Sequence, residues 1–441
     1  MTLKRFVLRT TTSLLFAAYV LFASTFLLFT VLEFVPSLAK HTSLQQIRYY
    51  AQRRDYQPDP TLVFLPSRAG HASRLDTDFL GDQYSPDYGV PHGAIPYHAT
   101  YTPDGFRENS SSPPFEIMLI GDSYVEFGET DQLTLSEQLT LLSGLTTFNL
   151  GRGWYGPFQY LELFKRYAPR LKPRYAVLCF FDGNDIEDTK QYLRWRKGKS
   201  YYTFVFSTKN YLGRYFTALR DSYKFLFKQV ERMVERRRST IPATAAVPKQ
   251  GESRSSEVHP DLGLVTLRDH LLPMRFNYWN HPLTTEQLLQ SEEWQAVGQV
   301  LKDFQLLAAE HGTVPVTLFI PKKVEVYGAF YSPRSGHNFL QRIREHMRFE
   351  NNSHDAFLTI AEQAGIRAVD LLPGFRTLAR EGTVLYYPFD THWNPLGRRT
   401  AAEMLAASLR EVRDARIVRF TTCRIMHVKF CERARGSRRA E

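Results

Sequence analysis

An apolar run that stops abruptly at a Gly-Asp-Ser turn constrains this chain more than any other feature. Ile117 to Ile120 are apolar without a break, which is typical of a strand buried on both faces of a parallel sheet. The run ends at Gly121-Asp122-Ser123, so the serine hydroxyl lies at the carboxyl end of the strand, where open α/β sheets bind ligands. A turn whose Asp and Ser merely cap the next helix explains the same residues, so a functional interpretation needs partners downstream.

Strands and helices alternate after this run. We expect further strands at residues 146–150, 174–181, 313–320 and 367–371, and helices at 136–142, 157–167, 286–311, 354–364, 373–380 and 396–412. Pro157 opens its helix where a missing N–H costs nothing, and Ser353 is expected to cap the helix that follows it. The alternation predicts an α/β fold with a doubly wound, parallel central sheet.

A helical insertion at about 187–282 interrupts the alternation. It is rich in Tyr, Phe, Arg and Lys, and residues 211–236 predict a basic helix with aromatic side chains. This helix either lies on a membrane surface or packs on the core with a solvated basic face. Residues 239–257 form a linker rich in Pro, Ala and Ser.

The N-terminus has the pattern of a membrane anchor. Lys4, Arg5 and Arg9 precede a charge-free, mostly apolar run at residues 10–32. A bilayer is crossed by about 20 apolar residues, and a positive flank stays on the inner side. We therefore predict a single transmembrane anchor at 10–34 that leaves the rest of the chain on the exported side. A cleaved signal peptide is the alternative.

Composition narrows the choice of partners. The chain has 441 residues, of which 43% are hydrophobic, so it can bury a large core. Its net charge is +11, with basic clusters at 194–199, 232–238 and 433–439, which lie in the insertion and the tail rather than along one aromatic-bearing face. This distribution favours solvated charge or a membrane surface over nucleic acid.

The cysteines do not indicate a disulfide framework. The chain has only 3 of them. Cys179 falls in a predicted buried strand and is interpreted as a core thiol. Cys423 and Cys431 can pair in an oxidising compartment, although their spacing alone does not establish a bond.

Polar residues that follow several strands converge on one edge of the predicted sheet. Ser123, the glycine loop 151–156 and Asn184 each follow a strand, and a later loop carries Asp390 and His392. Residues two apart in an extended segment point to the same side, so the aspartate can brace the imidazole. A serine needs such a base, because its hydroxyl is a poor nucleophile at its own pKa. The pattern predicts a Ser-His-Asp triad for acyl transfer.

The oxyanion produced by serine attack needs preplaced donors, each worth about 3–4 kcal/mol in comparable sites. The candidates are the backbone N–H of Ser123, a backbone N–H of loop 151–156 and the side-chain amide of Asn184. No metal is expected, because a strand turn and a helix cap explain the acidic cluster at 182–188. Asp370 also ends a strand, but no histidine stands beside it in the sequence.

Four sequence blocks carry a family resemblance. Gly-Asp-Ser at 121–123, Asn-Leu-Gly-Arg-Gly-Trp-Tyr-Gly at 149–156, Gly-Asn-Asp at 183–185 and Asp-Thr-His-Trp-Asn at 390–394 resemble the SGNH (GDSL-type) hydrolases in order and spacing. The resemblance implies a flavodoxin-like three-layer α/β/α sandwich and esterase or acyl-transfer chemistry without a metal or other cofactor. The Asp-x-His spacing and Gly-Phe-Arg at 105–107 look most like the membrane-linked bacterial branch, which handles acyl groups on exported polysaccharides.

Position by position, the resemblance implies that Ser123 is the nucleophile and Asn184 an oxyanion donor. It implies that Asp390 and His392 complete the triad. Two positions depart from the family pattern. Tyr124 replaces the usual Leu after the nucleophile, which we expect to affect packing more than chemistry. The family pattern has a glycine as the second oxyanion donor. In this chain that position falls near Gly153 and aligns with Trp154, so the sequence leaves open which of these two residues is the donor. Trp154 serves only if the loop does not require a positive φ there; its side chain can instead line an acyl or sugar pocket.

These observations predict a single-pass membrane protein with its catalytic domain at 113–412, on the periplasmic or extracellular side. A neck segment at 35–112 precedes this domain and a basic tail at 413–441 follows it. We expect a serine esterase that removes O-acyl groups, including O-acetyl, from exported carbohydrate. The alternatives are a polysaccharide O-acyltransferase with the same triad and a non-catalytic glycan-binding scaffold. The expected partners are an acylated carbohydrate or small ester and the membrane, without nucleic acid; the sequence does not indicate the oligomeric state.

Overall fold

The computed structural model describes residues 3–34, 56–66, 70–74, 97–198 and 262–414. The chain divides into two compact units, one formed by residues 1–68 and 193–254 and the other by residues 69–192 and 255–441. Some features predicted from the sequence lie outside the described residues: the helix at 211–236, the linker at 239–257, Cys423 and Cys431.

A short hairpin is the only sheet among the described residues of the first unit. Its strands β1 (Tyr56–Asp59) and β2 (Val63–Pro66) pair antiparallel. Oδ1 of Asp59 accepts the backbone N–H of Thr61 at 2.9 Å and that of Leu62 at 2.7 Å. The aspartate therefore closes the turn that the two strands need.

Helix α1 (Leu3–Phe34) covers the charge-free run near the N-terminus. Across the described parts of the chain, however, no helix combines the length and the apolar character needed to cross a membrane. The transmembrane anchor predicted at 10–34 is therefore not supported.

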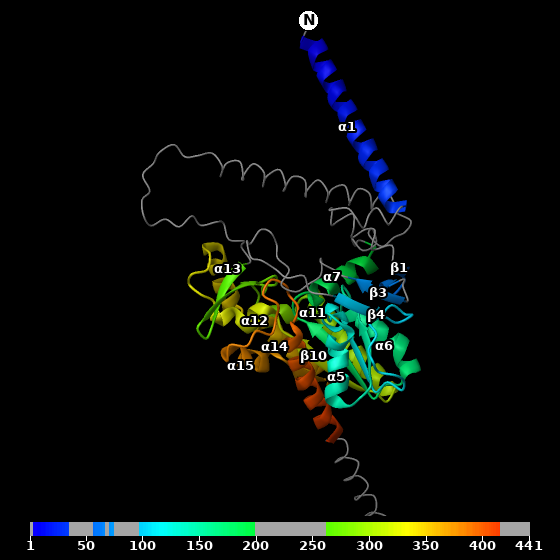
Figure 1. Ribbon diagram of the computed structural model, residues 1–441, viewed down its shortest axis with the longest axis vertical. Helices are drawn as coiled ribbons and strands as arrows, with labels where there is room; N and C mark the ends of the chain where they lie inside the picture. The colour runs from blue at the N-terminus through cyan, green and yellow to red at the C-terminus, as the bar shows by residue number, and fades with distance from the viewer. Residues whose placement is uncertain (1–2, 35–55, 67–69, 75–96, 199–261, 415–441) are drawn as a thin grey trace, which may run out of the picture. The chain divides into compact units, whose positions relative to one another are not determined.

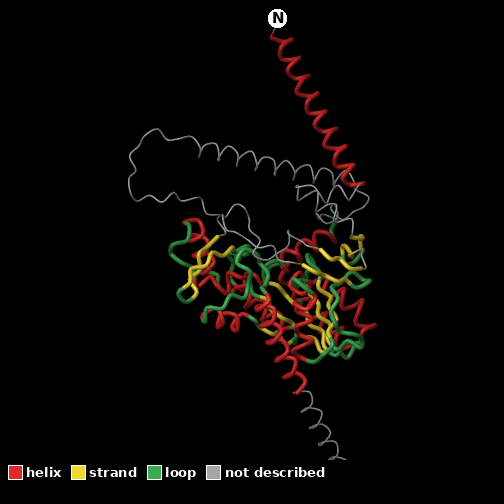
Figure 2. The backbone as a smooth tube through the Cα atoms, viewed as in Figure 1, coloured by secondary structure: helices red, strands yellow, loops and turns green. Residues whose placement is uncertain are grey.

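The second unit is built on a five-stranded sheet (Figure 2). The strands follow the order β11 (Arg367–Asp370), β10 (Val314–Ile320), β7 (Tyr175–Phe181), β5 (Ile117–Gly121) and β6 (Thr147–Gly151), and every neighbouring pair is parallel. All residues of β5 and β7 are buried, as expected for parallel strands covered on both faces. This sheet confirms the predicted α/β fold, and its strand order is that of flavodoxin-like sheets.

Helices on the strand connections cover the sheet (Figure 1). α5 (Leu135–Ser143) connects β5 to β6, whereas α6 (Pro157–Leu171), α11 (Glu292–Glu310) and α14 (Asn352–Gln363) lie on the connections that lead towards β11. The strand order reverses direction after β6, and right-handed crossovers then place α5 on one face and the other three helices on the opposite face. Helix α11 accordingly packs against both α6 and α14.

The remaining elements include several that the sequence did not indicate. They are β3 (Gly70–Arg74), β4 (Tyr97–Tyr101), α4 (Ser123–Glu126), η3 (Asp131–Leu133), α7 (Asp185–Arg196), β8 (Leu262–Leu267), β9 (His270–Arg275), α10 (Thr285–Leu289), α12 (Lys323–Tyr327), η4 (Gly328–Phe330), α13 (His337–Arg348), α15 (Leu372–Arg380) and a final helix at 395–414. The single helix predicted at 286–311 is two helices, because the Ser291 hydroxyl accepts the Trp294 N–H at 3.4 Å and starts α11 anew. The described part of the insertion contains the hairpin β8–β9 as well as helix α7.

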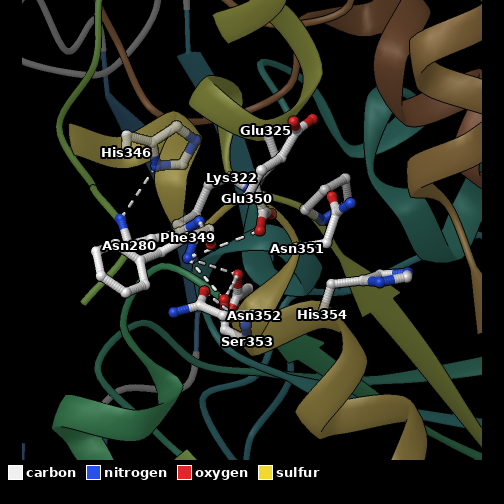
Figure 3. A network of polar contacts seen from close by, with 12 residues as sticks. Asn280, Lys322, Glu325, His346, Phe349, Glu350, Asn351, Asn352, Ser353 and His354 are labelled. Carbon is white, nitrogen blue, oxygen red and sulfur yellow. Dashed lines mark hydrogen bonds and ion pairs between the residues drawn. The ribbon is translucent and has the colours of Figure 1, made fainter. Parts of the chain in front are cut away.

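A buried polar network joins β7, β10 and α14 at the carboxyl edge of the sheet (Figure 3). The Lys322 ammonium lies 2.6 Å from Asp182 Oδ2 and donates to Ser353 Oγ at 2.9 Å, while the Ser353 hydroxyl donates to Asp182 at 2.7 Å. The prediction that Ser353 caps its helix was wrong. Helix α14 begins at Asn352, two residues earlier than predicted, with Asn351 at the N-cap position. The Ser353 hydroxyl instead binds the charged pair, which offers stronger hydrogen bonds than a neutral N–H.

Replacing Lys322 by Met is expected to lower the free energy of unfolding by about 3–5 kcal/mol, because the Asp182 carboxylate is left buried without its cation. Urea unfolding followed by circular dichroism measures this loss. The control is Lys165→Met, which breaks a partly exposed pair with Glu162 on α6. That change should cost less than about 1 kcal/mol, and equal losses in the two variants would contradict the role given to Lys322.

Candidate active site

The serine that follows β5 meets a histidine from near the end of the described chain. Ser123 is the first residue of α4, and its Oγ lies 2.8 Å from Nε2 of His392. Nδ1 of the same ring lies 2.6 Å from Oδ1 of Asp390, which also accepts the His392 backbone N–H at 2.8 Å. The fold thus brings together the three residues that the sequence predicted as a triad.

The electrostatics of Asp390 determine which nitrogen of His392 carries the proton. Burial raises the pKa of Asp390, but the attraction of His392 and the hydrogen bonds from its ring and backbone outweigh burial, so the pKa lies below the usual 3.8. An ionised carboxylate can only accept hydrogen bonds, so Nδ1 is the protonated nitrogen. Nε2 therefore presents its lone pair to the Ser123 hydroxyl, as a general base requires.

Aromatic side chains hold the His392 ring in place. The Tyr124 and Phe127 rings lie 4.9 and 5.1 Å from it, centroid to centroid, and Tyr124 also packs edge-on against Trp393 at 4.8 Å. The Tyr124 hydroxyl donates to the carbonyl of Thr391 at 2.5 Å. Tyrosine at this position therefore packs against the catalytic loop and also hydrogen-bonds to it.

A buried lysine fixes the segment that leads into the catalytic loop. Lys323 is only 4% exposed. Its Nζ atom lies within hydrogen-bonding distance of four backbone carbonyls: those of Arg275 at 3.1 Å, Tyr387 at 2.5 Å, Pro388 at 3.0 Å and Asp390. A buried charge must be matched by such hydrogen bonds, so the ammonium and the loop constrain each other. Lys323 was not predicted from the sequence as part of the site. The sequence feature that could have pointed to it is the pair of lysines just after the strand predicted at 313–320.

The glycine loop lies directly beside the nucleophile. A Cβ built on Gly153 would lie 3.7 Å from Cβ of Ser123. The Gly153 N–H is already engaged, because it donates to Oε2 of Glu126 at 2.7 Å, while the Arg152 guanidinium holds Oε1 at 2.7 Å. The Gly153 N–H is therefore less accessible to an oxyanion than the sequence suggested, and Trp154 stays a candidate beside it.

Trp154 has a backbone conformation that residues with a side chain disfavour. Its φ is 69°, in the left-handed region, which costs roughly 1–2 kcal/mol for a residue with a Cβ. From the sequence, Trp154 was expected to serve as an oxyanion donor only if the loop does not require a positive φ at this position. The loop does have a positive φ here, and tryptophan adopts this conformation nonetheless. Strained residues of this kind cluster at active sites. The Trp154 side chain is also 39% exposed, so a ligand can reach it.

Asn184 lies on the turn after β7, close to the residue that precedes the nucleophile. One N–H of its amide donates to Oδ2 of Asp188 at 2.7 Å, and the same side chain also interacts with the Asp122 carboxyl group. Asp122 is fully buried, and burial raises its pKa to about 6 against the opposing effects of the Tyr124 N–H, His392 and the Asn184 side chain. The site therefore contains one ionised carboxyl group and one that titrates close to neutrality.

The acidic cluster at 182–188 binds protein groups. Asp185 accepts the hydroxyl of Tyr160 at 2.8 Å and the backbone N–H of Phe181 at 3.0 Å. Burial and the neighbouring carboxylates raise its pKa well above the usual value. Within the described residues, no three His, Cys, Asp or Glu side chains gather as a metal site would require.

Asp370, which the sequence suggested as a rival to Asp390, pairs with a different histidine. Its Oδ2 lies 2.9 Å from Nε2 of His354, and Nδ1 of that ring lies 2.8 Å from Asp355. Burial lowers the pKa of His354, but the two carboxylates outweigh burial and raise it to about 9. The second Asp-His pair therefore joins α14 to the end of β11 and does not compete for His392.

Replacing Trp154 by Gly is expected to keep hydrolysis of a small aryl acetate within about threefold of the parent. Glycine retains the backbone N–H and adopts positive φ without strain. Trp154→Pro should abolish turnover, because proline has no N–H and its φ is fixed near −65°. Steady-state kinetics measure both variants, and an equal loss in the two would show that the loop N–H is not the reason Trp154 matters.

Replacing Asp122 by Asn is expected to change how stability depends on pH. The folded-state pKa lies above the unfolded value, so Asp122 stabilises the fold most below pH 3.8, and this contribution is lost as the pH rises through about 6. The asparagine variant should therefore gain about 3 kcal/mol relative to the parent between pH 4 and pH 7. Urea unfolding at the two pH values tests this, and a difference that does not change with pH would contradict it.

Comparisons with known proteins agree with the resemblance seen in the motifs. Residues 280–425 match the family described as the SGNH hydrolase-like domain of acetyltransferase AlgX. Over 55 residues the chain is 44% identical to a Pseudomonas aeruginosa protein described as "Probable alginate O-acetylase AlgJ", a match that covers 12% of this chain and 14% of that protein.

Similar solved structures include two enzymes. A GDSL-like lipase from Bacteroides thetaiotaomicron is 7% identical with a TM-score of 0.32, over 68% of this chain and 89% of that one. The acetyl xylan esterase AlAXEase is 9% identical with a TM-score of 0.30, over 66% and 98% of the two chains. The family match over residues 280–425 includes the block at 390–394, and it agrees with the SGNH resemblance that the sequence blocks carry.

Proposed function

We propose that this chain is a serine enzyme that transfers O-acetyl groups to carbohydrate through an acyl-enzyme at Ser123. The observation that carries the proposal is the pair of hydrogen bonds from Ser123 Oγ to His392 Nε2, at 2.8 Å, and from His392 Nδ1 to Asp390 Oδ1, at 2.6 Å. Ser123 and His392 are 269 positions apart, so only the fold aligns them. A nucleophile, a base and an orienting carboxylate in this order are the arrangement that covalent acyl transfer uses.

In the first half-reaction, Ser123 Oγ attacks the carbonyl carbon of the donor ester while His392 Nε2 takes the serine proton. The developing oxyanion is stabilised by the N–H groups of Ser123 and Trp154 and by the Asn184 amide. His392 then returns the proton to the leaving oxygen, the donor C–O bond breaks and the acetyl group stays on Ser123. Asp390 stabilises the imidazolium form while it carries that proton.

In the second half-reaction, a sugar hydroxyl gives its proton to His392 and attacks the acetyl-serine. The C–O bond to Ser123 breaks and His392 returns the proton to the serine oxygen, which leaves an acetylated sugar and a free enzyme. Transfer to carbohydrate is supported by the acetyltransferase description of the matched family and by the O-acetylase description of the P. aeruginosa relative.

Hydrolysis is the second candidate function. Water takes the place of the sugar hydroxyl in the same step, and the product is acetate. The partial exposure of Ser123 favours this reaction, because it gives water access to the acyl-enzyme. The third hypothesis, a glycan-binding scaffold without turnover, has less support, since the three triad side chains are already aligned. The exported location stays a prediction from the charged N-terminal flank, and cell fractionation would test it.

The test supplies the purified protein with an aryl acetate and an oligosaccharide. Acetylated oligosaccharide, detected by mass spectrometry, is the expected product of the parent. Ser123→Ala should lower acetyl release at least about a thousandfold and abolish labelling by a serine-directed phosphonate. The control is Ser143→Ala, which removes a hydroxyl that donates to the Leu139 carbonyl and accepts the Leu145 N–H at the end of α5.

Each other outcome assigns a different function. Acetate as the sole product, lost in Ser123→Ala, would make the chain an esterase. Unchanged acetyl release in Ser123→Ala would remove that residue from the chemistry. Oligosaccharide binding that survives Ser123→Ala, together with a parent that turns over no ester, would identify a scaffold.

A further inference from the structure

The segment that leaves hairpin β8–β9, residues 275–280, is fixed at both of its ends; we call it the return arm. At its start, the Arg275 N–H donates to the carbonyl of Pro388 at 2.8 Å, and Lys323 donates to the Arg275 carbonyl at 3.1 Å. Pro388 lies only two positions before the triad aspartate. The start of the return arm is therefore bound to the catalytic loop itself.

The far end of the return arm is held by α13 and the turn that follows it (Figure 3). Asn280 donates its backbone N–H to Nδ1 of His346 at 3.3 Å and its side-chain N–H to the Phe349 carbonyl at 2.8 Å. Burial, with Lys322 and Arg376 nearby, lowers the pKa of His346 to about 3, so this ring is neutral and can accept. The residues between Arg275 and Asn280 therefore have little freedom to move away.

Tyr278, in the middle of the return arm, lies on the turn that carries the expected oxyanion donor. A Cβ built on Gly183 would lie 3.0 Å from Cδ2 of Tyr278, and the ring packs edge-on against Phe181 at 5.4 Å. Gly183 directly precedes Asn184. The return arm thus runs from the loop that carries the base to the turn that carries the amide, and Tyr278 contacts that turn.

The Tyr278 hydroxyl has no hydrogen-bond partner among the described residues, although the ring is half-buried. Burial raises its pKa to about 12, and the carboxylates of Asp122, Asp188 and Asp390 add to the rise. The group is therefore a neutral O–H donor at physiological pH, and no described residue accepts its hydrogen bond. Such a donor gains free energy when a ligand brings an oxygen to it.

The oxygens of the substrate identify the acceptor for this donor. An acetyl ester has two oxygens: the carbonyl oxygen faces the oxyanion donors, and the ester oxygen faces His392 Nε2 as the leaving atom. Neither is free for an additional donor, and the acetyl methyl group accepts no hydrogen bond. Only an alcohol with further oxygens can supply the acceptor.

We propose that Tyr278 is a substrate-contacting residue whose hydroxyl donates a hydrogen bond to a ring or hydroxyl oxygen of a polyhydroxylated alcohol. This inference rests on the proposed function and names one residue that recognises its carbohydrate. It also gives the end of the insertion a role, because the return arm carries this contact.

The test compares two acetate esters that differ only in the oxygens of the alcohol: an O-acetylated methyl glycoside and cyclohexyl acetate. In Tyr278→Phe, the fall in kcat/KM for the glycoside acetate should exceed the fall for cyclohexyl acetate by roughly five- to tenfold, the usual effect of one neutral hydrogen bond. Tyr331→Phe is the matched control, since that tyrosine lies beside Val265 of hairpin β8–β9 and should give equal ratios for both esters.

Equal losses on the two esters in Tyr278→Phe, or no loss on either, would overturn the contact with the alcohol. Thermal unfolding of the variant separates a folding defect from a lost contact, because a folding defect lowers both rates together. A parent that turns over neither ester would overturn the proposed function and this inference with it. A parent that acts on both while Tyr278→Phe keeps the same preference would overturn this inference alone.

Discussion

The buried ammonium of Lys323 is the interaction on which the catalytic geometry depends. The loop from Tyr387 to His392 has no regular secondary structure of its own to place it, and loops are ordinarily the most mobile parts of a domain. A single charge bound to the carbonyls of Tyr387, Pro388 and Asp390 gives this loop a fixed point at the start of α12. Because the same ammonium binds Arg275, the return arm and the base-bearing loop form one assembly.

Burial gives the two carboxyl groups around His392 different properties. Asp390 receives hydrogen bonds from the ring and the backbone of His392, so its pKa falls although it is buried. Asp122 is also buried, but its hydrogen bonds and the nearby His392 do not outweigh burial, and its pKa rises to about 6. Environments that separate the pKa values of neighbouring groups commonly mark acid-base sites. Because the two pKa values differ in this way, Asp390 is ionised at neutral pH, whereas Asp122 gains or loses its proton as the pH passes through about 6.

The sequence predicted the central sheet and the triad because both leave local patterns. Unbroken apolar runs identify buried parallel strands, and an Asp and a His two residues apart identify a braced base. Boundaries at polar capping residues were less accurate. Ser291 splits a helix that looked continuous. Ser353 binds an ion pair whose members, Asp182 and Lys322, follow two different strands.

The parts of the site that the sequence did not predict depend on contacts between distant segments. Nothing near Glu126 indicates that its carboxylate will engage the Gly153 amide, and nothing near Tyr278 indicates Gly183 as its neighbour. Glu126 and Gly153 lie on different strand connections, whereas Gly183 and Tyr278 lie far apart on the one connection from β7 to β10. Both pairs meet only at the carboxyl edge of the sheet. The choice between Gly153 and Trp154 as donor was open for the same reason.

The separation of Ser123 from His392 along the chain also bears on how the protein is made. Ribosomes synthesise the chain from its N-terminus, so the serine emerges with the first strand of the sheet and the imidazole follows 269 positions later. A serine hydroxyl without its base is a poor nucleophile. The Ser123 hydroxyl of the nascent polypeptide therefore stays without its base until the last sheet strand and the loop beyond it have been translated and folded.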